Sequence, residues 1–455
     1  MFISVEAKFV TNEKSATGAE SQQPALNDNL MERVLSPENL QAAWKQVKGN
    51  KGAPGVDGIS IEAYPQWARA HWAATRRALE GGYYIPQPVM RVEIPKPSGG
   101  SRSLGIPTVN DRVIQQAIAQ VLNPIIDPSF SESSHGFRPG RNAHGAVRQV
   151  KGFIEAGYKV AVDVDLSTFF DRVNHDILMT RLSRHIADKR LLKLIGRYLR
   201  AGVMIDGKRH PTPEGVPQGG PLSPLLANVV LDDLDKHLES RAMRFARYAD
   251  DFTICVKSTS AGHRVMQWVK QFLSTKLKLV INEEKSKVVK TNELHFLGFT
   301  FKGKKIRWGD QALSDFKHQI RRLTKRSWGI SMHRRYRELR LYIQGWINYY
   351  GLSEYYRPLP GLDEWIRRRI RMCYLKQWRK PRTRIRNLIK LGTRTFTAVC
   401  LGLSSKGPYR LARTLATQSG MTNRWLAKQG LVSVRELWIK FHYADESPSA
   451  DPHAR

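Results

Sequence analysis

The strongest constraint on the fold comes from two adjacent acids, Asp250 and Asp251, between two stretches that alternate as strands do. Phe245 precedes the pair, and Ile254 and Val256 follow it at alternate positions, so the pattern predicts a hairpin with both acids in its tight turn. Two carboxylates in one turn repel each other unless a cation neutralises them, and divalent metals do this through oxygen ligands. A solvated turn is the common alternative for such a pair taken alone.

A third acid follows a different predicted strand. Apolar residues alternate over residues 160–166, and Asp165 lies near the end of this segment. An acid that ends a buried strand is expected to face a site, because burying it without a partner is costly. Asp163 shares its face one step earlier and is the competing candidate. Asp165 and the Asp250 turn together predict a carboxylate cluster for two Mg²⁺ ions, with Mn²⁺ as a substitute, that would activate a primer hydroxyl and hold a triphosphate.

The charge of the chain points to a polyanionic partner. Its 455 residues carry 74 Lys and Arg against 40 Asp and Glu, a formal net charge of +34. This balance disfavours a neutral metabolic enzyme, and nucleic acid is the commonest partner of such a protein. The three cysteines show no CxxC spacing, which favours a reducing compartment. No apolar run approaches the length of about 18 residues that a membrane span needs, so we expect no contact with a membrane.

The last third of the chain differs from the rest. Residues 301–400 hold 26 Lys and Arg against 6 Asp and Glu, a net charge of +20. Apolar residues recur at helical spacing from Tyr336 to Tyr350, and a second such helix follows the break at residues 358–361. The aromatic side chains are expected to lie mostly in a core. The cations are expected to face RNA, because so much charge repels itself without a polyanion, although a solvated face is the alternative.

Seven ordered motifs carry a resemblance to a known family. They are Pro-Lys-Pro at 95–97 with Arg102, Gly-Phe-Arg-Pro-Gly-Arg at 136–141, the Asp165 segment up to Phe170, residues 215–224, the Tyr-Ala-Asp-Asp of 248–251, residues 282–286 and Leu-Gly-Phe at 297–299. With the loop at 50–58 and the region 346–350, the chain resembles bacterial group II intron reverse transcriptase/maturases over residues 31–440. No Cys/His spacing of an HNH endonuclease follows residue 400, so we expect the type that lacks this domain.

The resemblance implies an α+β fold with right-hand polymerase architecture, in which fingers and palm with an antiparallel sheet precede an α-helical thumb and maturase region, domain X. The implied segments are a flexible leader at 1–30, fingers and palm at 31–305, thumb and domain X at 306–390, a basic maturase/DNA-binding extension at 391–444 and a disordered tail at 445–455.

The resemblance also implies roles for individual residues. Asp165, Asp250 and Asp251 would be catalytic and would bind metal, with Leu166 as a further ligand. Nucleotide contacts would come from Lys96, Arg102, Phe170, Gln218 and Lys285. Template, primer or RNA contacts would come from Arg138, Arg141, Gly298, Arg367, Arg368 and Arg371.

Each assignment has a plainer alternative. Lys96 and Arg102 suit triphosphate oxygens but also an ordinary surface hairpin. Phe170 would exclude a ribose 2′-hydroxyl or be a core aromatic. Gln218 lies in a turn that starts a helix in either case, and Lys285 could serve the leaving phosphate or simply be solvated. Gly298 fits a primer-gripping hairpin as well as an ordinary strand turn.

The predicted function is that of an RNA-directed DNA polymerase that copies its group II intron RNA from a DNA primer with dNTPs and assists splicing and mobility. The expected location is the bacterial cytoplasm, in association with the nucleoid or a ribonucleoprotein. The alternatives are another bacterial reverse transcriptase class (retron, diversity-generating or defence-associated) and an RNA-binding splicing cofactor without catalysis.

Overall fold

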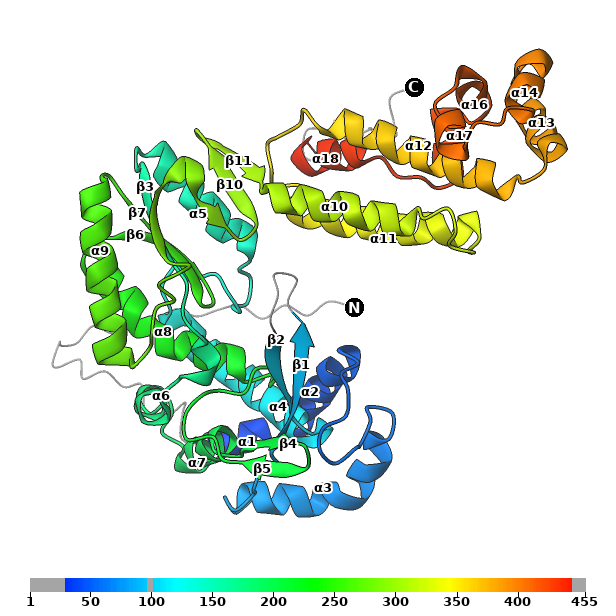
Figure 1. Ribbon diagram of the computed structural model, residues 1–455. Coiled ribbons are helices and arrows are strands. Elements are labelled where there is room, and N and C mark those ends of the chain that lie inside the picture. The colour runs from blue at the N-terminus through cyan, green and yellow to red at the C-terminus, as the bar shows by residue number, and fades with distance from the viewer. Residues whose placement is uncertain (1–28, 96–100, 444–455) are drawn as a thin grey trace, which may run out of the picture. The chain divides into compact units, whose positions relative to one another are not determined.

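The computed structural model describes residues 29–95 and 101–443 (Figure 1). The chain forms two compact units, and it crosses between them three times. Unit 1 comprises residues 1–128 and 174–223, and unit 2 comprises residues 129–173 and 224–455.

Unit 1 combines helices with a small mixed sheet in the strand order β2-β1-β4-β5. Helix α4 is its buried centre, and α1 and α2 pack against it. Ser36 caps the start of α2, because its hydroxyl accepts a hydrogen bond from the Asn39 amide. The elements are α1 Leu30–Val34, α2 Pro37–Gly49, α3 Tyr64–Glu80, β1 Val89–Pro95, β2 Ser101–Ile106, α4 Val109–Ile126, α6 His175–Leu182, α7 Lys189–Leu199, β4 Val203–Ile205 and β5 Lys208–His210.

Unit 2 begins with a four-stranded antiparallel sheet in the order β6-β7-β3-β8. Helix α5 packs on one face, where its apolar residues meet Ala161, Ala246 and Cys255. Helix α9 covers the other face, as Figure 1 shows, and Gly262 lies there against valines of β3, β7 and β8. The elements are α5 Ala143–Glu155, β3 Val160–Val164, α8 Ser223–Ser240, β6 Arg244–Tyr248, β7 Asp251–Val256, α9 Thr259–Phe272 and β8 Lys287–Lys290.

A three-stranded sheet and a helical region complete unit 2. The buried side chains from Trp308 to Trp438 form one continuous core. The predicted apolar stripe of α11 lies inside it, since Tyr336, Ile343 and Trp346 are buried, which favours the core assignment of these aromatics. The elements are β9 His295–Phe296, β10 Phe299–Lys302, β11 Lys305–Trp308, α10 Asp310–Leu323, α11 Met332–Tyr350, α12 Leu359–Gln377, α13 Pro381–Lys390, α14 Thr395–Gly402, α15 Pro408–Leu411, α16 Leu415–Gly420, α17 Asn423–Lys428 and α18 Val434–Tyr443.

The predicted ends of the chain are tested only in part. Residues 1–28 of the predicted leader and the predicted tail at 445–455 lie outside the described residues. In the described part of the chain, Asn29 precedes α1 and Leu30 is completely buried in it, so the helix begins where the predicted leader ends. No helix in the described part of the chain is long and apolar enough to cross a membrane.

Candidate active site

The predicted acids gather at one end of the four-stranded sheet. In the antiparallel pair of β3 and β7, Asp163 lies opposite Thr253 and Val164 lies opposite Phe252, so the next step places Asp165 opposite Asp251. Side chains alternate between the faces of a strand. Asp163, Asp165 and Asp251 therefore share one face, which is the face that α5 covers farther along the sheet. This strand register agrees with the hypothesis that acids far apart in the sequence meet at one end of the sheet.

Asp250 occupies a two-residue turn between β6 and β7. Tyr248 pairs with Asp251, which leaves only Ala249 and Asp250 in the turn. Ala249 has a φ of 59°, a left-handed conformation that is uncommon for a residue with a Cβ. Gly136 packs against this backbone, since a Cβ there would lie 2.2 Å from the Ala249 nitrogen. The glycine of the 136–141 motif is thus required by close approach to the acidic turn.

The carboxylates perturb one another. Burial, followed by the charges of Asp163, Asp250 and Asp165, raises the pKa of Asp251 to about 7. Burial also raises the pKa of Asp163 to about 6, although Lys287 opposes the shift. Crowded acids of this kind are stabilised when a cation is added.

The donor chemistry of this cluster fits Mg²⁺, because the side chains offer only carboxylate oxygens. Among the described residues, however, no three His, Cys, Asp or Glu side chains already stand as a ready metal site. The predicted ligation by Asp165, Asp250 and Asp251 is therefore a proposal. Leu166 could contribute only its main-chain carbonyl, because its apolar side chain is buried.

The motif at 282–286 fixes the end of β3. The Asp165 amide donates to the Ser286 hydroxyl at 3.0 Å, and the Asn282 amide donates to the Asp165 carbonyl at 2.9 Å. The same loop brings Lys285 Nζ to 3.8 Å from Asp165 Oδ2, with both side chains partly exposed. Lys285 therefore lies beside the acid cluster, as its predicted role requires.

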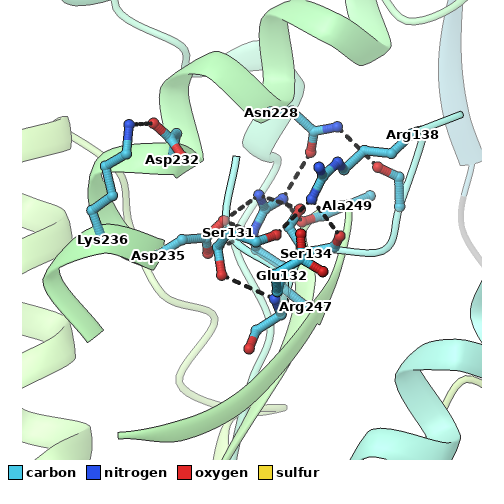
Figure 2. Close-up of polar contacts among 12 residues, drawn as sticks. Ser131, Glu132, Ser134, Arg138, Asn228, Asp232, Asp235, Lys236, Arg247 and Ala249 are labelled. Atoms are coloured by element: carbon cyan, nitrogen blue, oxygen red, sulfur yellow. Dashed lines mark hydrogen bonds and ion pairs between the residues drawn. The ribbon is translucent and has the colours of Figure 1, made fainter. Parts of the chain in front are cut away.

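A buried arginine that had no predicted role supports the acidic turn (Figure 2). Arg247 is completely buried, and its Nε donates to Asp235 Oδ1 at 2.8 Å. Its Nη1 donates to the Ala249 carbonyl at 3.0 Å and to Asn228 Oδ1 at 2.9 Å, and its Nη2 donates to the Ser134 hydroxyl at 2.7 Å. Arg247 points to the sheet face opposite the one that carries Asp251, so it binds the backbone of the turn from that opposite face.

The remaining nucleotide-site candidates lie in two places. Lys96 is outside the described residues, and Arg102 is exposed on β2 opposite Ile94. The Gly105 amide of β2 donates to the Gln218 carbonyl at 2.7 Å. Both contacts lie within unit 1, where the 215–224 motif therefore packs against β2.

In unit 2, Phe170 is half-exposed beside a fully buried aromatic neighbour. The ring of Phe169 occupies the core, and the two ring centres lie 5.1 Å apart in an edge-to-face arrangement. Since Phe169 is the core aromatic, Phe170 remains available for the predicted contact with a sugar.

The structure corrects the predicted role of Arg138. This residue is buried, and its Nη1 donates to the carbonyls of Ser131 and Ser134 at 2.5 and 3.0 Å. Its guanidinium thus shapes the loop instead of facing a template strand. Arg141 is partly exposed and is ion-paired with Glu132.

The predicted RNA-facing arginines of α12 also differ from one another. Arg371 is buried, whereas Arg367 and Arg368 are partly exposed. Arg371 is therefore not on the open surface of the helix, and the contact of all three with RNA remains a prediction.

Gly298 lies in a tight turn between β9 and β10. Leu297 and Gly298 have φ values of 51° and 78°, and a Cβ on Gly298 would lie 3.0 Å from the Tyr350 hydroxyl. Tyr349 donates its hydroxyl to the Leu297 carbonyl at 2.9 Å. Helix α11 therefore holds this hairpin, whose contact with a primer remains a prediction.

Comparisons with known proteins agree with the motifs. The family of reverse transcriptases (RNA-dependent DNA polymerases) matches residues 94–301, and the group II intron maturase-specific domain matches residues 313–392. Protein YkfC of Escherichia coli K12 is 33% identical over 341 residues, which cover 66% of this chain and 90% of YkfC. The group II intron-encoded protein LtrA of Lactococcus lactis is 34% identical over 261 residues, which cover 57% of this chain and 42% of LtrA.

Among solved structures, a partial Cas6-RT-Cas1–Cas2 complex matches with a TM-score of 0.35 and 26% identity, over 54% of this chain and 43% of that one. The two family matches confirm the predicted polymerase fold, the enzyme class and the maturase region. The chain therefore belongs to the group II intron-encoded reverse transcriptase/maturase family.

Proposed function

We propose that this protein extends a DNA primer along group II intron RNA with dNTPs, and that Asp165, Asp250 and Asp251 are its catalytic carboxylates. The proposal depends on one observation, the convergence of these acids at a single end of the β6-β7-β3-β8 sheet. The match to the maturase-specific domain favours a group II intron enzyme over a retron or a diversity-generating or defence-associated one.

The residues around that end of the sheet have different proposed roles. Asp165, Asp250, Asp251 and the Leu166 carbonyl would hold Mg²⁺ or Mn²⁺, which when bound neutralises charge on the attacking and leaving oxygens. Asp251 must lose its proton to serve as a ligand, and its raised pKa makes that loss incomplete near neutral pH until a cation is present. Lys285 keeps a positive charge beside Asp165, where a triphosphate would lie.

Phe170 provides the proposed sugar selection. Its half-exposed ring follows the end of β3 by a few residues, where a flat apolar face against the sugar would exclude a 2′-hydroxyl and offer it no hydrogen-bond partner. Lys96, Arg102 and Gln218 complete the proposed nucleotide contacts through the residue-by-residue match to the family.

The test is primer extension on poly(rA)/oligo(dT) with Mg²⁺. Asp250→Asn is expected to abolish extension while the melting temperature shows a folded protein. Glu283→Gln is the matched control, because it removes an exposed acid from the neighbouring 282–286 loop that is paired only with Lys270. Unchanged extension by Asp250→Asn would remove Asp250 from the mechanism and the polymerase proposal with it.

We further propose that the helical region binds the intron RNA and assists splicing. The net charge of +20 over residues 301–400 supports this role, and so does the maturase-specific match. Asp250→Asn is expected to keep its splicing activity, because the acids lie in the polymerase sheet and not in the helices. Loss of splicing together with polymerization in a folded variant would contradict separate sites.

A further inference from the structure

A cavity of about 460 Å³ lies between α12 and the segment that runs from α15 to α17. Figure 1 shows α16 and α17 beside α12, and all of them belong to unit 2. The lining residues used below are Trp365, Arg367, Arg368 and Arg371 from α12, and Arg413 and Asn423 from the segment beyond it. The cavity therefore joins the predicted domain X helix to the chain beyond residue 390.

The cavity concentrates positive charge without compensation. Four of its lining residues are arginines, and Glu364 is the acid among the residues that line it. In the part of the chain that the structure describes, none of these four guanidinium groups is paired with a carboxylate. Burial, followed by the charge of Arg367, lowers the pKa of Arg371 to about 10. Unpaired buried cations are costly, so this geometry is stabilised by an anion.

Two of the four guanidinium groups are held in place by the protein. Arg371 donates through Nε to the Met421 carbonyl at 2.9 Å and through Nη2 to Asn423 Oδ1 at 3.0 Å. Among the described residues, no acceptor binds the Arg371 Nη1 atom. This atom is also not one of the polar atoms that are completely buried without a partner. Arg368 donates to the Tyr409 carbonyl at 3.2 Å and lies 3.8 Å from the centre of the Tyr409 ring. Such fixed donors lose little entropy when an anion binds.

The other two arginines are uncommitted. The side chains of Arg367 and Arg413 have no hydrogen-bond or ion-pair partner within residues 29–95 and 101–443. Arg367 belongs to α12 and Arg413 to the segment after α15. An anion bound by both would therefore connect these two segments.

We propose that this cavity binds a backbone phosphate of a nucleic-acid strand. Guanidinium groups match phosphate oxygens through paired hydrogen bonds. The volume lies in the range of small-ligand pockets, so a nucleotide unit fits where a bare ion would leave most of the space empty. Trp365 also lines the cavity, and the guanidinium groups of Arg321 and Arg369 lie 5.7 and 5.5 Å from the centre of its ring. The inference rests on the proposed function in one respect, namely that the polyanion is a nucleic acid.

The test measures nucleic-acid affinity of the full chain. Arg367→Gln and Arg413→Gln are combined, because neither side chain has a hydrogen-bond or ion-pair partner to lose among the residues that the structure describes. Arg424→Gln on α17 is the matched control, an exposed arginine beside Asn423 that does not line the cavity. Fluorescein-labelled single-stranded RNA and DNA of one sequence are titrated by anisotropy at several KCl concentrations.

The double variant is expected to bind about tenfold or more weakly, and the slope of log affinity against log salt should fall by about 0.7 for each lost phosphate contact. A loss with RNA and DNA alike supports a shared backbone phosphate, and a loss with RNA alone supports an RNA strand as its source. Affinity and slope equal to those of the wild type and of Arg424→Gln, in a folded protein, would overturn the site.

The outcome is separable from that of the polymerase proposal. At saturating poly(rA)/oligo(dT), the double variant should keep its extension rate, because its changes lie outside the acidic sheet end. Asp250→Asn should instead lose extension and keep its RNA affinity. Failure of one proposal therefore leaves a result that differs from failure of the other.

Discussion

Asp235→Asn is expected to destabilise the protein by about 3–5 kcal/mol, because it leaves the Arg247 guanidinium buried without its counter-charge. Neither side chain is exposed at all. Asp235 accepts from Arg247 Nε at 2.8 and 3.0 Å and from Nη2 at 2.5 Å, so its carboxylate is bound by two nitrogens of the guanidinium and supplies its counter-charge. An asparagine of nearly the same shape would keep the volume and lose the charge. The free energy change therefore reports electrostatics and not a cavity.

The same helix supplies the control. Asp232, one turn earlier on α8, is also mostly buried, but it is paired with the half-exposed Lys236, as Figure 2 shows. Because the Lys236 side chain is half-exposed, water can solvate its charge once Asp232 is replaced by a neutral residue. Asp232→Asn is expected to change the free energy of unfolding by less than about 1 kcal/mol.

The buried pair should also matter for the reaction. Arg247 holds the Ala249 carbonyl, and Asp250 is the next residue, so a loosened guanidinium displaces a catalytic acid. Misplacement by about 1 Å lowers rates by roughly a hundredfold, so Asp235→Asn should reduce kcat at temperatures where it is folded. Arg247→Lys keeps the positive charge but loses the forked N–H donors of the guanidinium. It should therefore retain more of the wild-type stability than of the wild-type activity.

Urea unfolding followed by circular dichroism gives the stability difference, and primer extension with saturating dNTPs gives kcat. The reasoning fails if Asp235→Asn and Asp232→Asn unfold at the same urea concentration. It also fails if Asp235→Asn is unstable yet extends primers at the wild-type rate below its melting transition, because the pair would then stabilise the fold without placing the turn.

Phe170→Ala should raise incorporation of rNTPs relative to dNTPs by about tenfold or more, measured by single-nucleotide extension with each substrate. The pKa of Asp163 is raised to about 6 and that of Asp251 to about 7, so the contribution of these two groups to the stability of the metal-free protein should be greatest below about pH 4. The free energy of unfolding should then fall by a few kcal/mol, on the order of the two pKa shifts, as the pH rises to about 7. Melting curves with EDTA and with Mg²⁺ should therefore separate as pH increases, and Asp251→Asn should reduce the separation. Gly298→Ala should lower stability by about 1 kcal/mol, because its φ of 78° and the Tyr350 hydroxyl both oppose a Cβ; an unchanged melting temperature would contradict this strain.

Strand periodicity predicted the acid cluster because the pleat of a sheet has only two faces. Once residues 160–166 and 244–256 are strands, the faces of Asp165 and Asp251 follow, and only the pairing of the strands remains to be found. The capped start of α2 at Ser36 was equally local. Such features depend on neighbours within a few residues, which the sequence shows directly.

The role of Arg138 could not be obtained in the same way. An arginine in a loop of glycine and proline looks exposed, and its burial depends on Ser131, Ser134 and the Phe130 ring. The division into two units could not be read from the sequence either, because the predicted segments, with boundaries at residues 305 and 390, follow one another along the chain, whereas the chain crosses between the units after residues 128, 173 and 223. Contacts between distant segments decide both features.

The sequence does contain a signal that Arg247 is buried. It stands two residues after Phe245 in an alternating strand, which places a permanent charge on an inward face. A charge at such a position requires a buried partner, and in the structure Asp235 of α8 supplies it. The inward position thus indicates a buried ion pair even before the helix and strand are known to touch.

Charged groups in this chain fall into two classes according to where their partners come from. Arg247 and Asp235 form an ion pair within the protein, and this pair holds the turn in one conformation. The acids at the sheet end lie close together, and burial followed by the neighbouring carboxylates raises the pKa of Asp251. In the α12 cavity, burial followed by the charge of Arg367 lowers the pKa of Arg371. A partner of opposite charge from outside the chain would stabilise both clusters, which is why metal ions are expected at the acidic one and nucleic acid at the basic one.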